Sequence, residues 1–212
     1  MSCPICKKRT PGRFCPAKGE KICAVCCGTE REVTITCPAA CSYLVAAHRY
    51  EDAHPRPVPP ETPLLNVHFS QDIVHAYQRL LAGLAFAVAK VAAGQPELSD
   101  PDVLAALQAL AETYKTLATG IYYEMPPDSP TPRALYGELS RFLDEAKGLE
   151  AERSGLPRIK DSEVLALLVF LYRLGVLRSN GRPRSRRFIE FLRGQFPEAP
   201  ELRRQESRII VP

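Results

Sequence analysis

Eight cysteines are the residues of this chain best suited to chemistry, and all of them lie within its first 41 positions. Their spacings, from the amino end, are C-x2-C, C-x7-C, C-x2-C-C-G and C-x3-C. Two cysteines that stand two or three residues apart can bind the same metal ion, because a tight turn between them brings both sulfurs together. Eight thiolates complete two tetrahedral sites, so the sequence predicts two Zn2+ ions. The predicted ligands are Cys3, Cys6, Cys15, Cys23, Cys26, Cys27, Cys37 and Cys41.

The residues around the cysteines agree with a metal-dependent module. Basic side chains between Cys6 and Cys23 would offset the negative charge of zinc bound to thiolates. They are Lys7, Lys8, Arg9, Arg13, Lys18 and Lys21. Large apolar residues other than cysteine are few in the first 50 positions. A unit of that size with so small a core is marginally stable unless it binds a metal.

Spacing alone allows several ways to divide the cysteines between two ions. We favour one site of Cys3, Cys6, Cys23 and Cys26 and a second site of Cys15, Cys27, Cys37 and Cys41. His48 is an alternative ligand that would most easily replace Cys27 or Cys15. Disulfides, an iron–sulfur cluster and a redox pair of Cys23 and Cys26 are alternatives to zinc. Disulfides are disfavoured because a signal peptide is missing. An iron–sulfur cluster is disfavoured because the ferredoxin run C-x2-C-x2-C-x3-C-P is missing, and a redox pair because the βαβ context is missing.

The segment after the central cysteines has the pattern of a strand followed by a helix. Val33, Ile35 and Cys37 alternate with polar residues, which predicts a half-buried strand. A helix over residues 39–50 would follow, with Cys41 one turn from its start. At Gly28 we expect the positive φ of a knuckle turn. A cysteine pair, a hairpin and a second pair at a helix start resemble the treble-clef and cross-brace zinc folds over residues 3–48.

A second resemblance involves longer motifs. They are Cys3-Pro4-x-Cys6, Arg13-Phe14-Cys15-Pro16-Ala17, Ile22-Cys23-x-x-Cys26-Cys27-Gly28-Thr29 and Cys37-Pro38-x-x-Cys41-x-Tyr43-Leu44. Together they resemble the amino ends of a family of uncharacterised bacterial cysteine-rich proteins. The segment Asn180-Gly181-Arg182-Pro183 resembles the same family. The resemblance implies a bacterial origin and no particular activity.

The elements that must position these ligands divide the chain into four parts. We expect a two-zinc module over 1–51, a proline-rich linker over 52–69, a helical bundle over 70–197 and a tail over 198–212. Five prolines between Pro55 and Pro63 favour an extended, semi-rigid linker. The second half of the linker contains Leu64, Leu65 and Val67, so a strap packed on the body is an equally good interpretation.

After the linker, apolar residues recur with the period of helices. Ser70 is expected to cap a helix that ends at Gly94, and Asp100 is expected to cap one whose apolar stripe reaches Ile121. Further helices would begin near 131, at 161 and, for a short fifth one, after Ser185. The predicted fold class is therefore mainly α, with a small N-terminal zinc-binding module (a short hairpin plus a helix) followed by a four- to five-helix bundle.

Charge is segregated along the chain, whose net charge is +4. Residues 1–50 carry +5, residues 51–177 carry −6 and residues 178–212 carry +5. The arginine segment, residues 178–187, contains no acid and contains Arg178, Arg182, Arg184, Arg186 and Arg187. Guanidiniums beside a helix start favour phosphate, and hence an anion such as nucleic acid. The alternative is that these arginines pair with the acidic middle of the chain or face water.

No catalytic pattern accompanies the cysteines. The sequences G-x-x-x-x-G-K-[ST], H-E-x-x-H, G-x-S-x-G and G-x-G-x-x-G are absent. A zinc site closed by cysteines lacks the open position of catalytic zinc. We therefore expect a non-catalytic zinc-binding adaptor for a protein partner, with nucleic-acid binding or an iron–sulfur protein as alternatives. Without a signal peptide or a membrane-length apolar run, a cytoplasmic protein with no membrane contact is expected.

Overall fold

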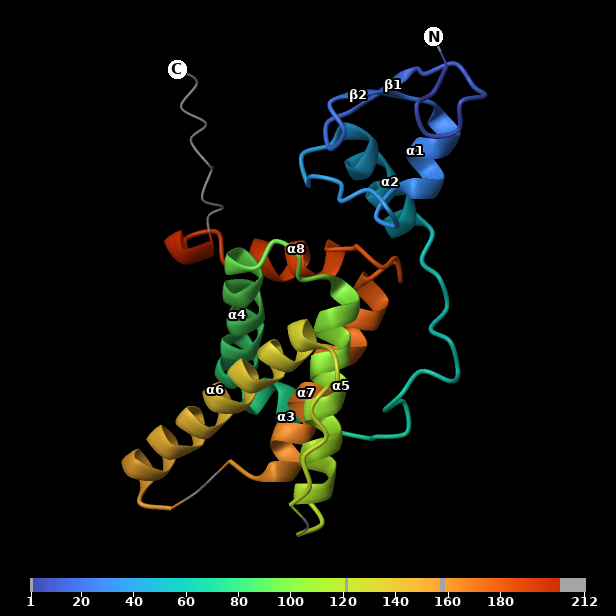
Figure 1. The fold of residues 1–212 in the computed structure, drawn as a ribbon. Helices are drawn as coiled ribbons and strands as arrows, with labels where there is room; N and C mark the ends of the chain where they lie inside the picture. Colours follow the sequence, from blue (N-terminus) through green and yellow to red (C-terminus); the bar gives the residue numbers. More distant parts are fainter. Residues whose placement is uncertain (1, 121, 157–158, 203–212) are drawn as a thin grey trace.

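The computed structural model describes residues 2–120, 122–156 and 159–202 and has a cysteine-rich module beside a helical body (Figure 1). Within these residues there are eight α-helices, a two-stranded antiparallel sheet and one 3-10 helix (Pro200–Leu202). This architecture confirms the predicted fold class. The expected end of a helical stripe at Ile121 and most of the expected tail lie outside the described residues.

The module consists of a hairpin and two helices. Strands β1 (Arg13–Cys15) and β2 (Glu20–Ile22) pair antiparallel, and they are followed by α1 (Ala24–Glu30) and α2 (Ser42–Ala53). Its core contains Ile22 and Ile35 together with buried cysteines. The sulfurs therefore occupy much of the space that larger apolar side chains fill in a protein of ordinary composition.

The structure corrects several local predictions for the module. Residues 32–37 form no strand, because Glu32 adopts a positive φ of 54° and turns the chain. Gly28 lies inside helix α1, and Lys7 is the residue with left-handed backbone in the first knuckle, with φ 54°. Helix α2 begins at Ser42, so Cys41 is its N-cap and does not lie one turn inside it.

Six helices form the body. They are α3 (Gln71–Ala76), α4 (Gln78–Gly94), α5 (Asp100–Leu117), α6 (Pro130–Ser154), α7 (Asp161–Arg178) and α8 (Arg187–Gly194). Helices α5 and α7 make the most extensive contact, and α6, α4 and α8 pack around them. Ser99 caps α5 and forms a capping box with Asp102, while Gly155 ends α6 with a positive φ of 73°. The expected continuous helix from Ser70 to Gly94 is interrupted at Tyr77.

The close contact between α5, α7 and α8 depends on a glycine. A Cβ atom placed on Gly175 would lie 2.7 Å from Leu104 and 2.8 Å from Phe188. Any larger residue would therefore force the side chains of Leu104 and Phe188 to shift. Helix α7 is buried on most sides, as its nearly uninterrupted apolar sequence predicts.

The chain between the module and the body is extended at first and then packs on the body. Leu64 is buried in the core of the body. Arg173 of α7 donates hydrogen bonds to the carbonyl oxygens of Leu64 and Val67. Residues 64–69 are thus a strap, which is the second of the two interpretations that the sequence allowed. In the described part of the chain, no helix combines the length and apolar character that crossing a bilayer requires.

Candidate metal centre

Four of the eight cysteines converge at the amino end of α1. The sulfurs of Cys3, Cys6, Cys23 and Cys26 all lie within 4.8 Å of one another. The Sγ atoms of Cys6 and Cys23 are 3.9 Å apart, close to the ~3.8 Å between two sulfurs that each lie 2.3 Å from one tetrahedral zinc ion. This cluster, the first of the two groups favoured from spacing, could hold a metal ion such as zinc.

Two backbone turns bring these sulfurs together. In the first turn, the N–H of Lys7 donates to the carbonyl oxygen of Cys3 at 2.7 Å. In the second, Cys23 is the N-cap of α1, and its sulfur accepts from the N–H of Cys26 at 3.4 Å. The N–H of Cys23 donates to the sulfur of Cys3 at 3.3 Å, which joins the two turns. Such donors stabilise the thiolate form that binds metal.

Hydrogen bonding and burial shift the pKa values of the thiols in this cluster in opposite directions. The backbone N–H groups of Lys8 and Arg9 lower the pKa of Cys6 to about 6. Burial raises the pKa of Cys26 to about 12, and its hydrogen bonds to the neighbouring thiols add to the rise. Four adjacent thiolates repel one another in the absence of a cation. A divalent ion would replace the remaining protons and relieve this repulsion.

The other four cysteines surround a small cavity of about 10 Å³, roughly the space that one water molecule needs. Cys15, Cys27, Cys37 and Cys41 line it, together with side chains from β1 and α2. Burial raises the pKa of Cys37, the N–H of Glu32 lowers it, and the nearby thiols of Cys41 and Cys15 raise it further. Among the residues that the structure describes, only the first group brings four sulfurs within 4.8 Å.

His48 faces a carboxylate in this structure. Its Nε2 lies 3.3 Å from Oε2 of Glu32, and Asn180 donates to the same oxygen at 2.8 Å. Burial raises the pKa of Glu32, but the hydrogen bonds of His48 and Asn180 and the charge of Arg182 lower it by more, so the net shift is downward. Sequence reasoning gave no role to Glu32 and named Asn180 only in the motif Asn180-Gly181-Arg182-Pro183. No sequence signal marks the contact between Glu32 and Asn180, which lie 148 positions apart.

Arg182 and Arg184 of the arginine segment bind helix α1 and the turn that follows it. The guanidinium of Arg182 donates to the carbonyl oxygens of Gly28, at 3.0 Å, and Arg31, at the C-terminal end of α1. A cation is favourable there because the helix dipole is negative at that end. The backbone N–H of Arg184 donates to the carbonyl oxygen of Glu32 at 2.8 Å, and its guanidinium donates to Thr36 at 3.0 Å.

The other three arginines contact α2 and the body. Arg186 donates to carbonyl oxygens at the C-terminal end of α4 and just beyond it, including Ala92 at 2.9 Å. Arg187 forms ion pairs with Glu51 and Asp52 of α2. The guanidinium of Arg178 lies 4.4 Å from the centre of the Phe191 ring. The arginine segment therefore connects the module to the body.

Asp100 anchors the far end of the arginine segment. Its carboxylate accepts from the hydroxyl of Ser185 at 2.7 Å and from the N–H groups of Phe188 and Ile189, both at 3.1 Å. Burial raises the pKa of Asp100, and these hydrogen bonds limit the rise. Asp100 thus caps α8, whereas Ser99 is the N-cap of α5. The sequence indicated a capping role for Asp100 and gave no sign that it reaches a second helix.

No protein-family model, curated protein or solved structure matches this chain. The fold and the site define its class as a mainly helical, cysteine-rich protein with a candidate four-sulfur metal site. The comparisons identify no family, so the motifs that resemble bacterial cysteine-rich proteins add no function here.

Proposed function

We propose that this chain is a non-catalytic zinc-binding adaptor whose module binds a protein partner. The observation that supports the metal part best is the convergence of four cysteine sulfurs in a mostly buried cluster. Four thiolates saturate tetrahedral zinc and leave no position for water or substrate, which is typical of structural zinc sites. The same four sulfurs could hold iron, so the identity of the metal is the first property to measure.

A second zinc ion at Cys15, Cys27, Cys37 and Cys41 is part of this proposal. These side chains line one cavity with room for a single atom. Binding would draw each sulfur to about 2.3 Å from the ion and would tighten the looser group. Two ions would then hold together a module whose apolar core is small.

A protein partner is favoured by the surface of the module. Phe14, Val25 and Val33 are large apolar side chains, and each is more than a third exposed. Aromatic side chains such as Phe14 are enriched where proteins associate. Nucleic-acid binding is the alternative that the arginine segment suggests. In the structure, the side chains of this segment form hydrogen bonds and ion pairs with other residues of the chain. Those contacts reduce the support for that alternative.

Elemental analysis of the purified chain tests the metal. Two zinc ions per chain are expected, and the double variants Cys3→Ser/Cys26→Ser and Cys37→Ser/Cys41→Ser should each retain one. The control Ser42→Ala, next to a ligand, should retain both. Iron in place of zinc contradicts the proposal. If the wild type binds a single zinc ion and Cys37→Ser/Cys41→Ser still binds it, the second site does not exist.

Photo-crosslinking in cells tests the partner. A photoreactive phenylalanine at position 14 should crosslink to protein, and the same group at the exposed position of Arg153 on α6 should not. When a lysate is irradiated in roughly 1 M salt, the protein crosslink should still form, because apolar contacts are not screened by ions. Crosslinks to RNA or DNA that form at low salt and fail to form at roughly 1 M salt would instead establish the nucleic-acid alternative.

A further inference from the structure

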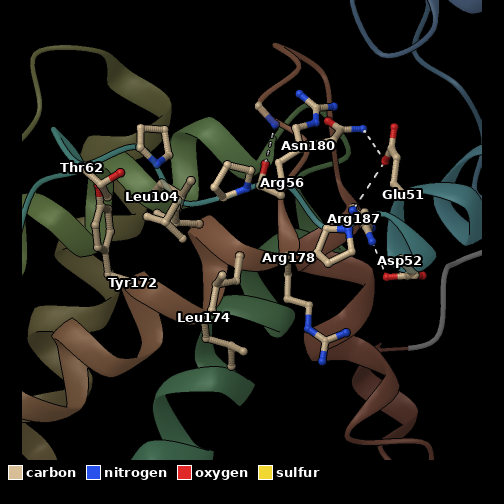
Figure 2. A pocket seen from close by; sticks show the side chains of 18 of the residues that line it. Glu51, Asp52, Arg56, Thr62, Leu104, Tyr172, Leu174, Arg178, Asn180 and Arg187 are labelled. Atoms are coloured by element: carbon tan, nitrogen blue, oxygen red, sulfur yellow. Dashed lines mark hydrogen bonds and ion pairs between the residues drawn. The ribbon is translucent and has the colours of Figure 1, made fainter. Parts of the chain in front are cut away.

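A pocket of about 610 Å³ opens between the extended linker and the body (Figure 2). Linker residues between His54 and Pro63 form one wall, and side chains from α5 and α7 form the other. The volume is within the range of ~300–1,000 Å³ that small-molecule sites occupy, and such sites are common where two units of a protein meet. The proposed adaptor function makes no use of this pocket.

The two ends of the pocket differ in character. Leu104 of α5 and Leu174 of α7 lie toward one end, near Tyr172 and Thr62 (Figure 2). The other end contains charged side chains from α2 and the arginine segment (Figure 2). An occupant that matches both ends has an apolar middle and a charged group at one end.

A hydroxyl that opens into the pocket and has no partner among the described residues lies at the apolar end. Tyr172 is only 4% exposed and lines the pocket. Within the described ranges, no hydrogen bond to its hydroxyl is found, and burial alone raises its pKa. The hydroxyl oxygen itself is accessible to solvent in the pocket. The Tyr172 hydroxyl is therefore available to a polar atom of a ligand.

The charged end has an excess of positive charge. Arg187 uses both Glu51 and Asp52 as ion-pair partners. Arg56 and Arg178 also line the pocket, and neither forms an ion pair with a carboxylate of the described residues. Three guanidiniums thus face two carboxylates. Both Arg56 and Arg178 are exposed, and the guanidinium of Arg178 also lies over the ring of Phe191. A carboxylate ligand could accept hydrogen bonds from either guanidinium.

We infer that the pocket binds a small amphiphilic carboxylate, with its anionic end at Arg56 and Arg178 and a neutral oxygen at the hydroxyl of Tyr172. Tyr172 and Arg178 stand six positions apart on α7, which corresponds to about 9 Å along the helix axis. A ligand with a medium-length apolar chain could reach both ends and bury that chain against Leu104 and Leu174, which line the pocket between them. An ω-hydroxy fatty acid of medium length has this chemistry.

Calorimetric titration of the full, metal-loaded chain with 8-hydroxyoctanoate, octanoate and 1,8-octanediol tests the inference. We expect 8-hydroxyoctanoate to bind with a dissociation constant of about 10–100 µM and the diol to bind at least tenfold more weakly. Arg178→Gln should weaken both carboxylates about three- to tenfold and leave the diol unchanged, whereas the exposed control Arg153→Gln should change nothing.

The variant Tyr172→Phe separates a ligand contact from a packing role. It should weaken 8-hydroxyoctanoate about fivefold and leave octanoate unchanged, because octanoate has no oxygen for the hydroxyl. Tyr114→Phe, at a buried tyrosine outside the pocket, is the control. Equal weakening of both ligands by Tyr172→Phe would overturn the contact. Equal binding of diol and carboxylates, or no binding at ~1 mM, would overturn the site.

Discussion

Replacing Asp100 by alanine should destabilise the protein more than any change of an exposed acid. The substitution deprives the hydroxyl of Ser185 and the N–H groups of Phe188 and Ile189 of their acceptor. Asp100 itself is fully buried, so no water replaces the lost carboxylate. Because α8 begins beside these donors, its amino end would lose its cap, and the anchor of the arginine segment would be lost with it.

The expected magnitude follows from these three hydrogen bonds. Hydrogen bonds to a charged group contribute about 1.5–3 kcal/mol each, and the desolvation of the buried carboxylate offsets part of that sum. We expect the free energy of unfolding to fall by about 3–5 kcal/mol, as when one partner is removed from a buried charged pair. In a chain of this size, that loss lowers the melting temperature by roughly 6–20 °C.

Thermal and urea unfolding of the metal-loaded protein, followed by far-UV circular dichroism, measures this loss. Asp100→Asn keeps one acceptor oxygen and should lose about 1–2 kcal/mol. Asp128→Ala, at a fully exposed aspartate with one weak ion pair, is the control and should change stability by less than about 0.5 kcal/mol. An Asp100→Ala protein within about 1 kcal/mol of the wild type would refute the capping argument.

Three further predictions concern the body and its contact with the module. Gly175→Ala should destabilise by about 1–3 kcal/mol in urea unfolding, because its Cβ has no room, whereas Gly148→Ala, where the space is open, should stabilise by about 0.5–1 kcal/mol. Burial and the 2.8 Å hydrogen bond to Glu163 raise the pKa of Tyr77 to about 12. The pKa of Tyr77 in the folded protein therefore exceeds its ordinary value of about 10. The extra stability of the wild type over Tyr77→Phe should be present below pH 10 and should decline between pH 10 and 12. Unfolding of both proteins at alkaline pH would measure this difference. Arg182→Ala should speed hydrogen exchange at the amides of α1 at least tenfold and leave that of α5 unchanged; equal protection in both proteins would contradict the contact.

The features that sequence predicted well depend on residues close together in the chain. Cys3 and Cys6 form one local turn, and Cys23 and Cys26 form another, so spacing alone indicates two halves of a site. The apolar periods of the body likewise predict helices that begin near Pro130 and at Asp161. These signals depend on backbone geometry within one or two turns, which single sequences encode directly.

The features that sequence missed depend on partners far apart in the chain. The positive φ of Glu32 replaces the strand that alternation predicted, because its carbonyl and carboxylate bind Arg184 and Asn180 about 150 residues later. For the arginine segment, sequence left open an external anion or partners within the chain, and Arg187 does pair with Glu51 and Asp52 of the acidic middle. The carbonyl partners of the segment at α1 and α4 have no sequence signature, since every residue has a carbonyl group.

The distance along the chain between Cys41 and Arg182 has a consequence for synthesis. All eight cysteines leave the ribosome about 140 residues before the arginine that contacts α1, which corresponds to roughly 7–28 s at ordinary elongation rates. During that interval the nascent module can acquire its metal while the C-terminal end of α1 and Glu32 are still in water. Metal uptake can therefore precede docking, and the arginine segment would then close onto a module that is already formed.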